Sequence, residues 1–416
     1  MLQYKKRKKE EIEMPKNIEA PTVYSKMELP VGVCEILSRF DKAGAEAYVV
    51  GGAVRNHLLG KKIDDYDITT ALTPDRVMEL FGDLRVITTG LKHGTVTVLL
   101  DNVGYEITTY RIEGEYLDNR HPSEVKFTPM LSGDLSRRDF TVNAMCYHPV
   151  RGFVDLFGGI EDINKGIIRA VGDARVRFTE DALRIIRALR FASVLDFDIE
   201  EKTKEAIGEL YHLLANISVE RIATELKKLM VGKGAYRIIG EFRDVFAFIL
   251  PELDRIALPA REKFEASTDG FVRFLSLFAL GSSRPEEAYQ TATRRLKLDR
   301  ATINRGTQAL EVEGLALDSK LAISEAFYKY GTEPVITDIH LRALLGKEAN
   351  YSLAVEVENN GIYSIKSMDI RGEDLIALGI KGVLVGQMLE KALFAIMRGE
   401  INNKKSEILD FVKGEI

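Results

Sequence analysis

The chain has few cysteines and no long apolar run. Only Cys34 and Cys146 occur among its 416 residues, too few for a disulfide framework, so a reducing cytoplasm is the expected compartment. No apolar stretch approaches the roughly 20 residues that a membrane span needs, and no membrane partner is expected. The basic cluster from Lys5 to Lys9 is followed by acids and not by an apolar stretch, so a signal peptide is not expected either.

The sequence also lacks internal repeats, low-complexity segments, a Walker-type glycine loop and any set of His and Cys residues at metal-ligand spacing. These absences argue against a repeat protein, a P-loop nucleotide hydrolase and a zinc-binding module. The composition is that of a globular protein, with 45% apolar and 29% charged residues. The length allows about two to four domains.

The charge of the chain is weakly negative and unevenly distributed. A net charge of −5 counts somewhat against a large nucleic-acid partner. Residues 165–190, however, hold seven positive side chains against three acids. A local basic strip can therefore coexist with the acidic total.

The stretch from Tyr48 to Thr70 has the pattern of a strand, a glycine turn and a helix, followed by a second strand. An apolar run ends at Val50, Gly51 and Gly52 break it, and helical spacing continues to Leu59. Paired glycines let a backbone approach a ligand without a Cβ in the way, and the start of a helix presents N–H groups. The turn is therefore suited to hold a phosphate.

Two acids follow in the expected second strand, Asp65 to Thr69. The period of two puts Asp65 and Asp67 on one face, where adjacent carboxylates repel each other and favour a cation. Hard oxygen ligands suit Mg²⁺, which keeps positions for water and for substrate phosphates. A phosphate-binding turn beside a two-carboxylate metal platform indicates phosphoryl or nucleotidyl transfer, with both acids as catalytic metal ligands.

The same residues carry a resemblance to a known family. GGAVRNHLLG followed by DDYDITT resembles the first motif of the tRNA nucleotidyltransferases, or CCA-adding enzymes, and of the bacterial poly(A) polymerases. The resemblance implies that Gly51, Gly52 and Arg55 help to position a nucleoside triphosphate. One departure is visible, because Asn56 stands where the family usually has Asp.

Residues 94–110 predict an antiparallel hairpin with a turn at 101–104, because apolar residues alternate on both sides of the turn. Glu106 is an acid among the β-forming residues of the second strand. It is either an outward-facing strand residue or, as the resemblance implies, a third catalytic carboxylate of the metal site. Arg111 follows that strand and is expected to reach the triphosphate.

Residues 134–145, DLSRRDFTVNAM, resemble the second motif of the family. Adjacent arginines beside an acid and an amide suit a triphosphate and ribose hydroxyls, because guanidinium presents a fixed fork of donors to phosphate oxygens. The resemblance implies that Arg138, Asp139 and Asn143 bind the nucleotide. The alternative is a salt-bridged start of a helix.

Two further stretches are assigned no chemistry. Residues 113–133 are polar and without periodicity, which predicts a mobile loop, and residues 118–122 within them resemble the family's flexible loop. Residues 154–159, VDLFGG, resemble the third motif of the family and predict a structural turn.

Residues 178–187 predict a helix opened by Thr179, with acids in its first turn. Asp181, Arg184 and Arg187 then lie on one face, because they are three residues apart. They form either an intrahelical ion pair or, as the resemblance to the family's Glu-Asp-x-x-Arg motif implies, the site that selects the base. A carboxylate that accepts from an exocyclic amino group, beside a guanidinium that donates to a ring nitrogen, suits cytosine and adenine and opposes guanine and uracil.

After this helix the sequence is strongly helical. Ser218 is expected to open a helix that resembles the neck of the family, and residues 233–345 show amphipathic helical periods without a catalytic constellation. A glycine-broken turn at 379–382 lies between two expected helices. It is either an ordinary helix–helix connector or a turn that offers backbone N–H groups to RNA phosphates. Residues 374–405 resemble the tail of bacterial CCA-adding enzymes, which grips tRNA.

The expected fold class is an α+β N-terminal nucleotidyltransferase head, with a mixed sheet and helices, followed by all-α neck, body and tail domains. The expected segments are an N-terminal extension at 1–24, a head at 25–160, a neck at 161–232, a body at 233–330 and a tail at 331–416. The resemblance implies template-independent addition of CCA to the 3′ end of tRNA, from CTP and ATP, with release of pyrophosphate and with Mg²⁺ as the cofactor.

Two alternatives to this function stay open at the level of sequence. Within the family, the chain could be an A-adding enzyme or a poly(A) polymerase, although it lacks the longer basic C-terminal extension that the latter often carry. Outside the family's activity, it could be a non-catalytic RNA-binding protein on the same scaffold, against which the complete set of carboxylates argues. The sequence leaves the oligomeric state open.

Overall fold

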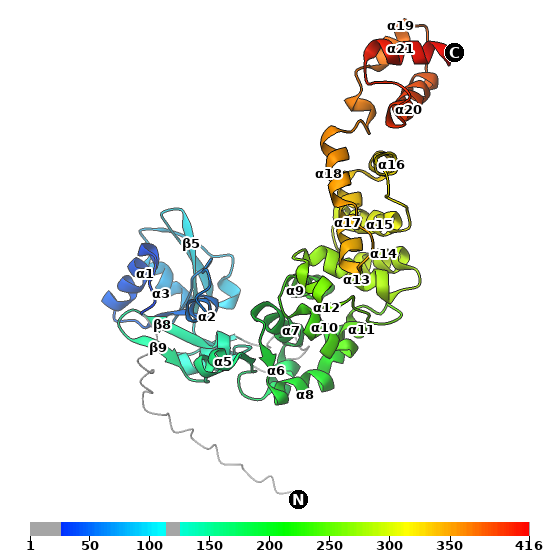
Figure 1. Cartoon of the computed structure of the whole chain (residues 1–416). Coiled ribbons are helices and arrows are strands. Elements are labelled where there is room, and N and C mark those ends of the chain that lie inside the picture. The colour runs from blue at the N-terminus through cyan, green and yellow to red at the C-terminus, as the bar shows by residue number, and fades with distance from the viewer. Residues whose placement is uncertain (1–25, 114–124, 416) are drawn as a thin grey trace, which may run out of the picture. The chain divides into compact units, whose positions relative to one another are not determined.

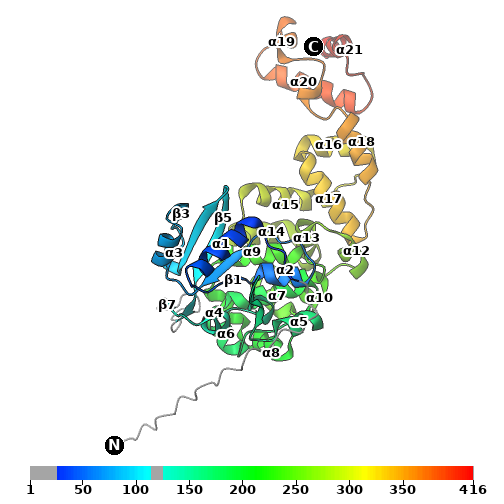
Figure 2. The ribbon, with the colours of Figure 1, turned by 90° about the vertical axis from the view of Figure 1, so that its left-hand side faces the viewer.

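Figure 1 and Figure 2 show the computed structural model of the chain, which describes residues 26–113 and 125–415. The chain divides into two compact units, of which the first ends at Arg177 and the second begins at Phe178. Helix α6 (Ala174–Glu180) crosses this boundary. The N-terminal extension and the segment 118–122 that the sequence singles out lie outside the described residues.

The first unit is built on a seven-stranded mixed sheet with the strand order β3-β4-β5-β2-β1-β8-β9. Strands β2 and β5 are parallel, and the other neighbouring strands of this sheet are antiparallel. The strands are β1 (Ala47–Val50), β2 (Asp67–Thr70), β3 (Arg85–Ile87), β4 (Thr95–Leu100), β5 (Val103–Thr109), β8 (Met145–His148) and β9 (Gly152–Asp155). Outside it lie β6 (Arg111–Glu113), which pairs with β7 (Val125–Phe127), and the short β10 (Ile167–Ile168).

Helix α1 packs on the face of the sheet that Tyr105 occupies. A Cβ built on Gly32 of α1 would lie 2.3 Å from the Tyr105 hydroxyl, so the two elements are in direct contact. The buried face of α1 is formed by Val33, Ile36, Leu37 and Phe40, which recur at the three- and four-residue spacing of one helix face. The helices of this unit are α1 (Val31–Lys42), α2 (Gly52–Leu58), α3 (Pro74–Leu80), α4 (Leu131–Ser136) and α5 (Gly159–Lys165), with 3-10 turns η1 (Leu91–His93) and η2 (Thr141–Asn143).

Three expected boundaries in this unit need correction. The hairpin of β4 and β5 is confirmed, but Asp101 and Asn102 alone connect its strands, with φ of 51° and 63° as in a type I′ turn. The strand expected from Asp65 begins only at Asp67, so Asp65 precedes the sheet. The loop predicted over 113–133 is too long, because β7 and the start of α4 lie within that range.

The second unit is helical apart from the short β11 (Asp198–Ile199), which confirms the expected helical remainder. Gly379 and Gly382, at φ of 90° and 62°, break the chain between two of its helices, as expected. No helix of the described residues is both long enough and apolar enough to traverse a bilayer. The helices are α7 (Leu183–Leu195), α8 (Glu201–Leu210), η3 (Tyr211–Asn216), α9 (Val219–Met230), α10 (Ala235–Glu241), α11 (Arg243–Ile249), α12 (Arg261–Ala266), α13 (Gly270–Gly281), α14 (Pro285–Arg295), α15 (Arg300–Glu313), α16 (Lys320–Tyr330), α17 (Thr332–Leu345), α18 (Tyr351–Asn360), η4 (Ile365–Ser367), α19 (Gly372–Ala377), α20 (Val383–Met397) and α21 (Lys405–Gly414).

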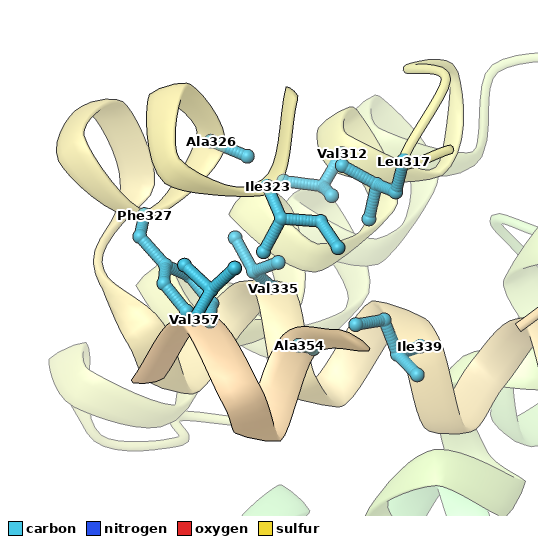
Figure 3. Packing of buried hydrophobic residues seen from close by; sticks show 9 residues of the cluster. All are labelled: Val312, Leu317, Ile323, Ala326, Phe327, Val335, Ile339, Ala354 and Val357. Carbon is cyan, nitrogen blue, oxygen red and sulfur yellow. The ribbon is translucent and has the colours of Figure 1, made fainter. Parts of the chain in front are cut away.

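Successive groups of helices in the second unit enclose apolar cores of their own. Figure 3 shows one of them, in which α15, α16, α17 and α18 meet around Ile323, Phe327 and Val335. A further core joins α19, α20 and α21 around Leu375 and Leu393. Burying one such side chain stabilises the fold by about 1.5–3 kcal/mol. Each of these helical groups is therefore held together mainly by its own apolar contacts.

Candidate active site

Two of the predicted acids lie side by side on the central strands of the sheet. The parallel register that pairs Ile68 with Ile107 brings Asp67 of β2 beside Glu106 of β5. Both lie on the face opposite Ile68 and Ile107, because side chains alternate along a strand. The antiparallel register with β1 places Asp67 opposite Val50, the residue before the glycine turn. The sheet thus joins the acids and the turn.

The acids also interact electrostatically. The pKa of Asp67 is raised, first because neighbouring atoms partly desolvate its carboxyl, although the residue keeps exposed surface. The negative charges of Glu106 and Asp65 raise it further, and the positive charge of Arg138 opposes them. Asp65, although outside the strand, therefore lies within electrostatic reach. Within residues 26–113 and 125–415, no group of at least three His, Cys, Asp or Glu side chains is arranged to hold a metal ion.

The glycine turn brings the backbone close to Arg138. Gly51 has φ 72° and ψ −121°, a conformation open to glycine but strained for other residues. A Cβ at this position would lie 3.2 Å from Nη1 of Arg138. The Gly51 N–H donates to the carbonyl of Met145, and α2 begins at the next residue, Gly52. Glycine is thus required both by the backbone conformation and by the close approach of the guanidinium.

A buried carboxylate, Asp134, connects β2 with the paired arginines. Its Oδ2 accepts from Nη2 of Arg138 at 3.0 Å and from the hydroxyl of Thr69 at 3.2 Å. Its Oδ1 accepts from Nε and Nη2 of Arg137 at 3.0 and 2.6 Å. Burial alone would raise the pKa of Asp134, but the charges of Arg138 and Arg137 outweigh it and hold the pKa below its usual value.

A second polar chain joins α2 to the η2 turn. Nη1 of Arg55 donates to Oδ1 of Asn143, and Nδ2 of Asn143 donates to Oδ1 of Asp139 at 3.0 Å. Asn56 accepts from Arg55 at 2.9 Å and donates to the carbonyl of Lys62, so the amide at the position of the family's usual Asp has a structural role here. Arg55, Asp139 and Asn143 therefore form one connected group, as the motifs suggest.

Arg111 is held by a different contact from the other arginines. It opens β6 and donates through Nη1 to the carbonyl of His93 in η1. Its side chain is partly exposed.

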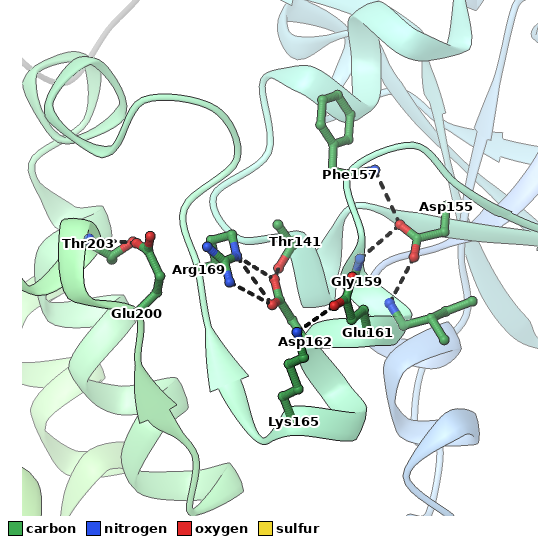
Figure 4. A network of polar contacts seen from close by, with 11 residues as sticks. Thr141, Asp155, Phe157, Gly159, Glu161, Asp162, Lys165, Arg169, Glu200 and Thr203 are labelled. Carbon is green, nitrogen blue, oxygen red and sulfur yellow. Dashed lines mark hydrogen bonds and ion pairs between the residues drawn. The ribbon is translucent and has the colours of Figure 1, made fainter. Parts of the chain in front are cut away.

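The third motif forms the structural turn that its sequence predicts, as Figure 4 shows. The Asp155 carboxylate accepts from the N–H groups of Phe157, Gly159 and Ile160 at 3.3, 2.9 and 2.8 Å and so caps α5. A Cβ on Gly159 would lie 2.3 Å from the carbonyl oxygen of Thr141, so only glycine lets α5 pack against η2. This turn supports the segment that carries Asn143.

Asp162 reinforces the same packing from within α5. Its carboxylate accepts from the hydroxyl of Thr141 at 2.6 Å and from Nε of Arg169 at 3.0 Å. In the second unit, also drawn in Figure 4, Glu200 accepts from the N–H of Thr203 at 2.8 Å and caps α8. These contacts are structural, and they assign no chemistry to the third motif or to the start of α8.

The prediction of one helix that begins at Thr179 is wrong. Thr179 and Glu180 end α6, and α7 begins at Leu183. Asp181 lies in the break, where its Oδ1 accepts from the N–H of Leu183 at 3.1 Å. An aspartate can satisfy such N–H groups at a helix start, and this local bond competes with a continuous helix. Arg184 follows in the first turn of α7.

Each charge of the proposed base-reading pair has a partner other than the one expected. Arg184 donates to Glu180 at 2.8 Å, and its side chain is 8% exposed. Asp181 pairs with Arg221 of α9 at 3.4 Å. Asp181 and Arg184 are therefore each paired with another charged residue.

Arg187 belongs to a further charged group between α7 and α9. The buried Glu225 lies 3.8 Å from Arg187 and 2.5 Å from Arg190. Both guanidinium groups lie over the ring of Phe191, at 5.4 and 3.6 Å from its centroid. The helix α9, expected from Ser218, supplies the acid that holds these arginines.

Sequence reasoning missed two residues that the structure connects to the site. Asp134 precedes the two arginines by three and four residues, a spacing that indicates ion pairs in a helix. That signal was available. Arg221 lies far from Asp181 along the chain, and no local pattern indicates their contact.

Comparison with known proteins identifies the family of the chain. Three family models match the chain: "Poly A polymerase head domain" at residues 47–169, "Probable RNA and SrmB- binding site of polymerase A" at 196–256, and tRNA nucleotidyltransferase domain 2 at 263–412. A curated CCA-adding enzyme of Lactobacillus delbrueckii subsp. bulgaricus is 37% identical over 91% of this chain and 96% of its own length. The chain belongs to the family of CCA-adding enzymes. These enzymes are tRNA nucleotidyltransferases.

Solved structures of CCA-adding enzymes share the fold. The crystal structure of the Bacillus stearothermophilus CCA-adding enzyme in complex with CTP is 30% identical, has a TM-score of 0.75 and covers 92% of this chain and 96% of its own. The Thermotoga maritima CCA-adding enzyme complexed with tRNA is 23% identical, with a TM-score of 0.68 and coverage of 93% and 96%. At that identity the second comparison supports the fold alone.

Proposed function

We propose that the chain adds C, C and A to the 3′ end of tRNA without a nucleic-acid template, from CTP and ATP, with release of pyrophosphate. The observation that carries this proposal is the register that sets Asp67 beside Glu106 and opposite the residue before the glycine turn. Membership in the family supports the choice of substrates, as does the relative solved with CTP.

We propose Asp65 and Asp67 as ligands of divalent cations, assisted by Glu106, with Mg²⁺ as the metal. The pKa of Asp67 is raised first by desolvation and then by the negative charges of Glu106 and Asp65, and a cation beside these carboxylates would offset that repulsion. Their oxygen atoms are the donors that Mg²⁺ prefers. Bound Mg²⁺ supplies activation of the attacking 3′-hydroxyl of tRNA and stabilisation of the departing oxygen.

The triphosphate is expected to lie against Gly51, Gly52 and the arginines Arg55, Arg111 and Arg138. The buried Nε of Arg138 has no hydrogen-bond partner among the described residues, so an acceptor from a phosphate fits it. Guanidinium donors match phosphate oxygens in geometry and charge.

Asn143 and Asp139 are proposed to bind the ribose. Both are already connected by a hydrogen bond of 3.0 Å, which fixes the orientation of the Asn143 amide. An amide and a carboxylate held in this way can accept and donate to vicinal hydroxyl groups.

Asp181 and Arg184 are proposed to select the base, with Arg187 beside them. To read cytosine or adenine, Arg184 must turn a donor from Glu180 to a ring nitrogen while Asp181 accepts from the amino group. Arg221 and the N–H of Leu183 hold the two oxygens of Asp181 and so orient it. Each mismatched contact with guanine or uracil costs about 1–3 kcal/mol.

One experiment separates the candidate activities. The purified protein is incubated with tRNA that lacks its 3′ end, Mg²⁺ and each nucleotide singly or together, and products are sized at single-nucleotide resolution. CTP alone should add two residues, and CTP with ATP should add three. Long adenosine tracts would indicate a poly(A) polymerase, addition of A alone an A-adding enzyme, and no pyrophosphate release a non-catalytic RNA-binding protein.

The segment boundaries at 160, 232 and 330, and a location in the cytoplasm, are part of the same proposal. The core around Ile323 includes residues from both sides of position 330, from Val312 to Val357, whereas the core around Leu393 is formed by buried residues from Met368 to Val412; the two cores support distinct helical segments but not the boundary at 330. The two unpaired cysteines, Cys34 and Cys146, support a reducing compartment.

A further inference from the structure

Asp134 is a fully buried carboxylate at the centre of four donors from three residues. Its exposed fraction is 0%, and both of its oxygens accept two bonds each, from Arg137, Arg138 and Thr69. A buried charge is costly unless it is paired and hydrogen-bonded, and Asp134 is both. Its contacts are therefore expected to be rigid.

The residues that Asp134 joins come from the two parts of the proposed site in the first unit. Thr69 lies two residues after Asp67 on β2 and so shares its face of the sheet. Arg138 follows α4 and reaches toward Gly51, where an ideal Cβ would be 3.2 Å from Nη1. One carboxylate thus spans the distance between the strand of the acids and the guanidinium beside the glycine turn.

Arg138 binds Asp134 with one end of its guanidinium group and faces the glycine turn with the other. Its Nη2 is held by Asp134 at 3.0 Å, its Nη1 faces the turn, and its buried Nε has no hydrogen-bond partner among the described residues. An arginine side chain is flexible, and fixing one end of its planar fork directs the remaining donors.

We propose that Asp134 is a positioning residue for the triphosphate of the incoming nucleotide, acting through Arg138. Its buried charge holds the guanidinium beside Gly51, so that the remaining donors meet phosphate oxygens without a further loss of side-chain entropy. This inference rests on the proposed nucleotide addition but names a residue that the motif comparison does not assign.

The first test is Asp134→Asn, which keeps the size of the side chain and removes its charge. KM for CTP and for ATP should both rise about tenfold. The substitution weakens the charged hydrogen bond that holds Arg138, and Arg138 is proposed to contact the triphosphate, which both substrates share. Binding of inorganic pyrophosphate, measured by titration calorimetry with Mg²⁺ and without tRNA, should weaken by a similar factor. Discrimination between CTP and UTP should not change, since the base is read in the second unit.

The second test is a double-mutant cycle with Arg138→Gln. If Asp134 acts through Arg138, then Asp134→Asn adds little to KM or to the pyrophosphate dissociation constant once Arg138 is replaced. Effects that multiply in the double variant would overturn the proposal, as would unchanged pyrophosphate binding in Asp134→Asn.

Asp338→Asn is the matched control. Asp338 is also 0% exposed and also pairs with an arginine four residues later, Arg342, at 2.7 Å, but in α17 of the second unit. This variant changes a buried aspartate with the same spacing to its arginine, and it should leave KM and pyrophosphate binding unchanged. A similar loss in both variants would indicate a general effect of buried charge and would overturn the proposal.

Two further outcomes are decided in the same way. If Asp134→Asn does not fold, Thr69→Val takes its place, because it removes only one donor to Asp134; pyrophosphate binding should weaken about twofold, and unchanged binding overturns the proposal. If the unmodified protein adds no nucleotide to tRNA, the proposed function fails, whereas pyrophosphate binding still tests the role of Asp134 separately.

Discussion

The two charged sites of this protein differ in how their charges are balanced. In the first unit, the negative charges of Glu106 and Asp65 both raise the pKa of Asp67. In the second unit, Asp181 faces Arg221 and Arg184 faces Glu180, so each charge has an opposite partner. A site with excess negative charge favours a cation, whereas a balanced site suits the neutral edge of a base.

The two sites also differ in what holds them. Asp67 and Glu106 of the first site are set by the hydrogen-bond register of β2 and β5, which side-chain changes disturb little. The charges of the second site are set by one another, across the break between α6 and α7 and across to α9. We therefore expect the first site to fail by loss of chemistry and the second to fail by loss of selectivity.

The largest effect is expected for Asp67→Ala. Transfer of both nucleotides should fall by at least about a thousandfold, because Asp67 is proposed to hold the metal that would stabilise charge at the reacting phosphate. Incorporation of labelled CMP into tRNA lacking its 3′ end measures this. Asp64→Ala, which replaces an exposed neighbouring acid paired with Lys62, is the control and should retain activity. Activity preserved in Asp67→Ala would refute the metal assignment.

Arg184→Gln should act on the choice of base alone. The ratio of kcat/KM for CTP to that for UTP should fall about 10- to 100-fold, because one mismatched contact no longer opposes uracil. Pyrophosphate binding should stay the same, since it involves the first unit. Arg237→Gln, which breaks an ion pair of 2.8 Å with Asp198 in the same unit, is the control. Equal loss of CTP and pyrophosphate binding would contradict the separation of the two sites.

Gly51→Ala tests whether the turn contributes geometry and not only flexibility. At φ 72° an alanine is strained by about 1–3 kcal/mol, and its Cβ would press on Arg138. KM for both nucleotides should rise roughly tenfold. Gly60→Ala has similar strain, at φ 61°, but meets nothing within 4 Å, so it should lower the melting temperature and leave KM unchanged. Identical kinetics for the two variants would count against a role of the turn in binding.

The smallest effect on activity is expected from Asp338, the buried counterpart of Asp134 in the second unit. Burial raises its pKa to about 6 despite the opposing charge of Arg342, whereas the arginines of Asp134 hold the pKa of that residue low. Because the folded pKa lies above the ordinary value, the stability that this carboxyl contributes is complete below about pH 4 and is lost as pH rises through 6.

The measurement is the free energy of urea unfolding of the second unit between pH 4 and 7.5. The difference between the unmodified protein and Asp338→Asn should change by up to about 3 kcal/mol across this range, given about 1.4 kcal/mol for each unit of pKa. Parallel pH dependences for the two proteins would show that Asp338 does not titrate as described.

Much of the first site could be predicted from local pattern. The alternation around Glu106 indicates a strand, the paired glycines indicate a turn, and the apolar spacing of α1 identifies its buried face. The start of β2 was misjudged by two residues, because Asp65 and Asp67 have the same local alternation whether or not β1 and β5 offer hydrogen bonds there.

The second site was less predictable for a physical reason. The run from Phe178 to Arg187 has helical propensity throughout, and nothing in it requires a break. The side chain of Asp181 instead satisfies the N–H of Leu183 and accepts an ion pair from Arg221, and these contacts stabilise the interruption. A partner forty residues away leaves no mark on local periodicity.

The amino-acid sequence by itself determined which chemical groups this protein possesses and their order within each strand, turn and helix, because those depend on neighbouring residues. The tertiary structure alone decided that β2 lies beside β5, that Asp134 joins Thr69 to Arg138, and that Arg221 reaches Asp181. Such contacts depend on packing free energy summed over segments distant in the chain, which no single stretch contains.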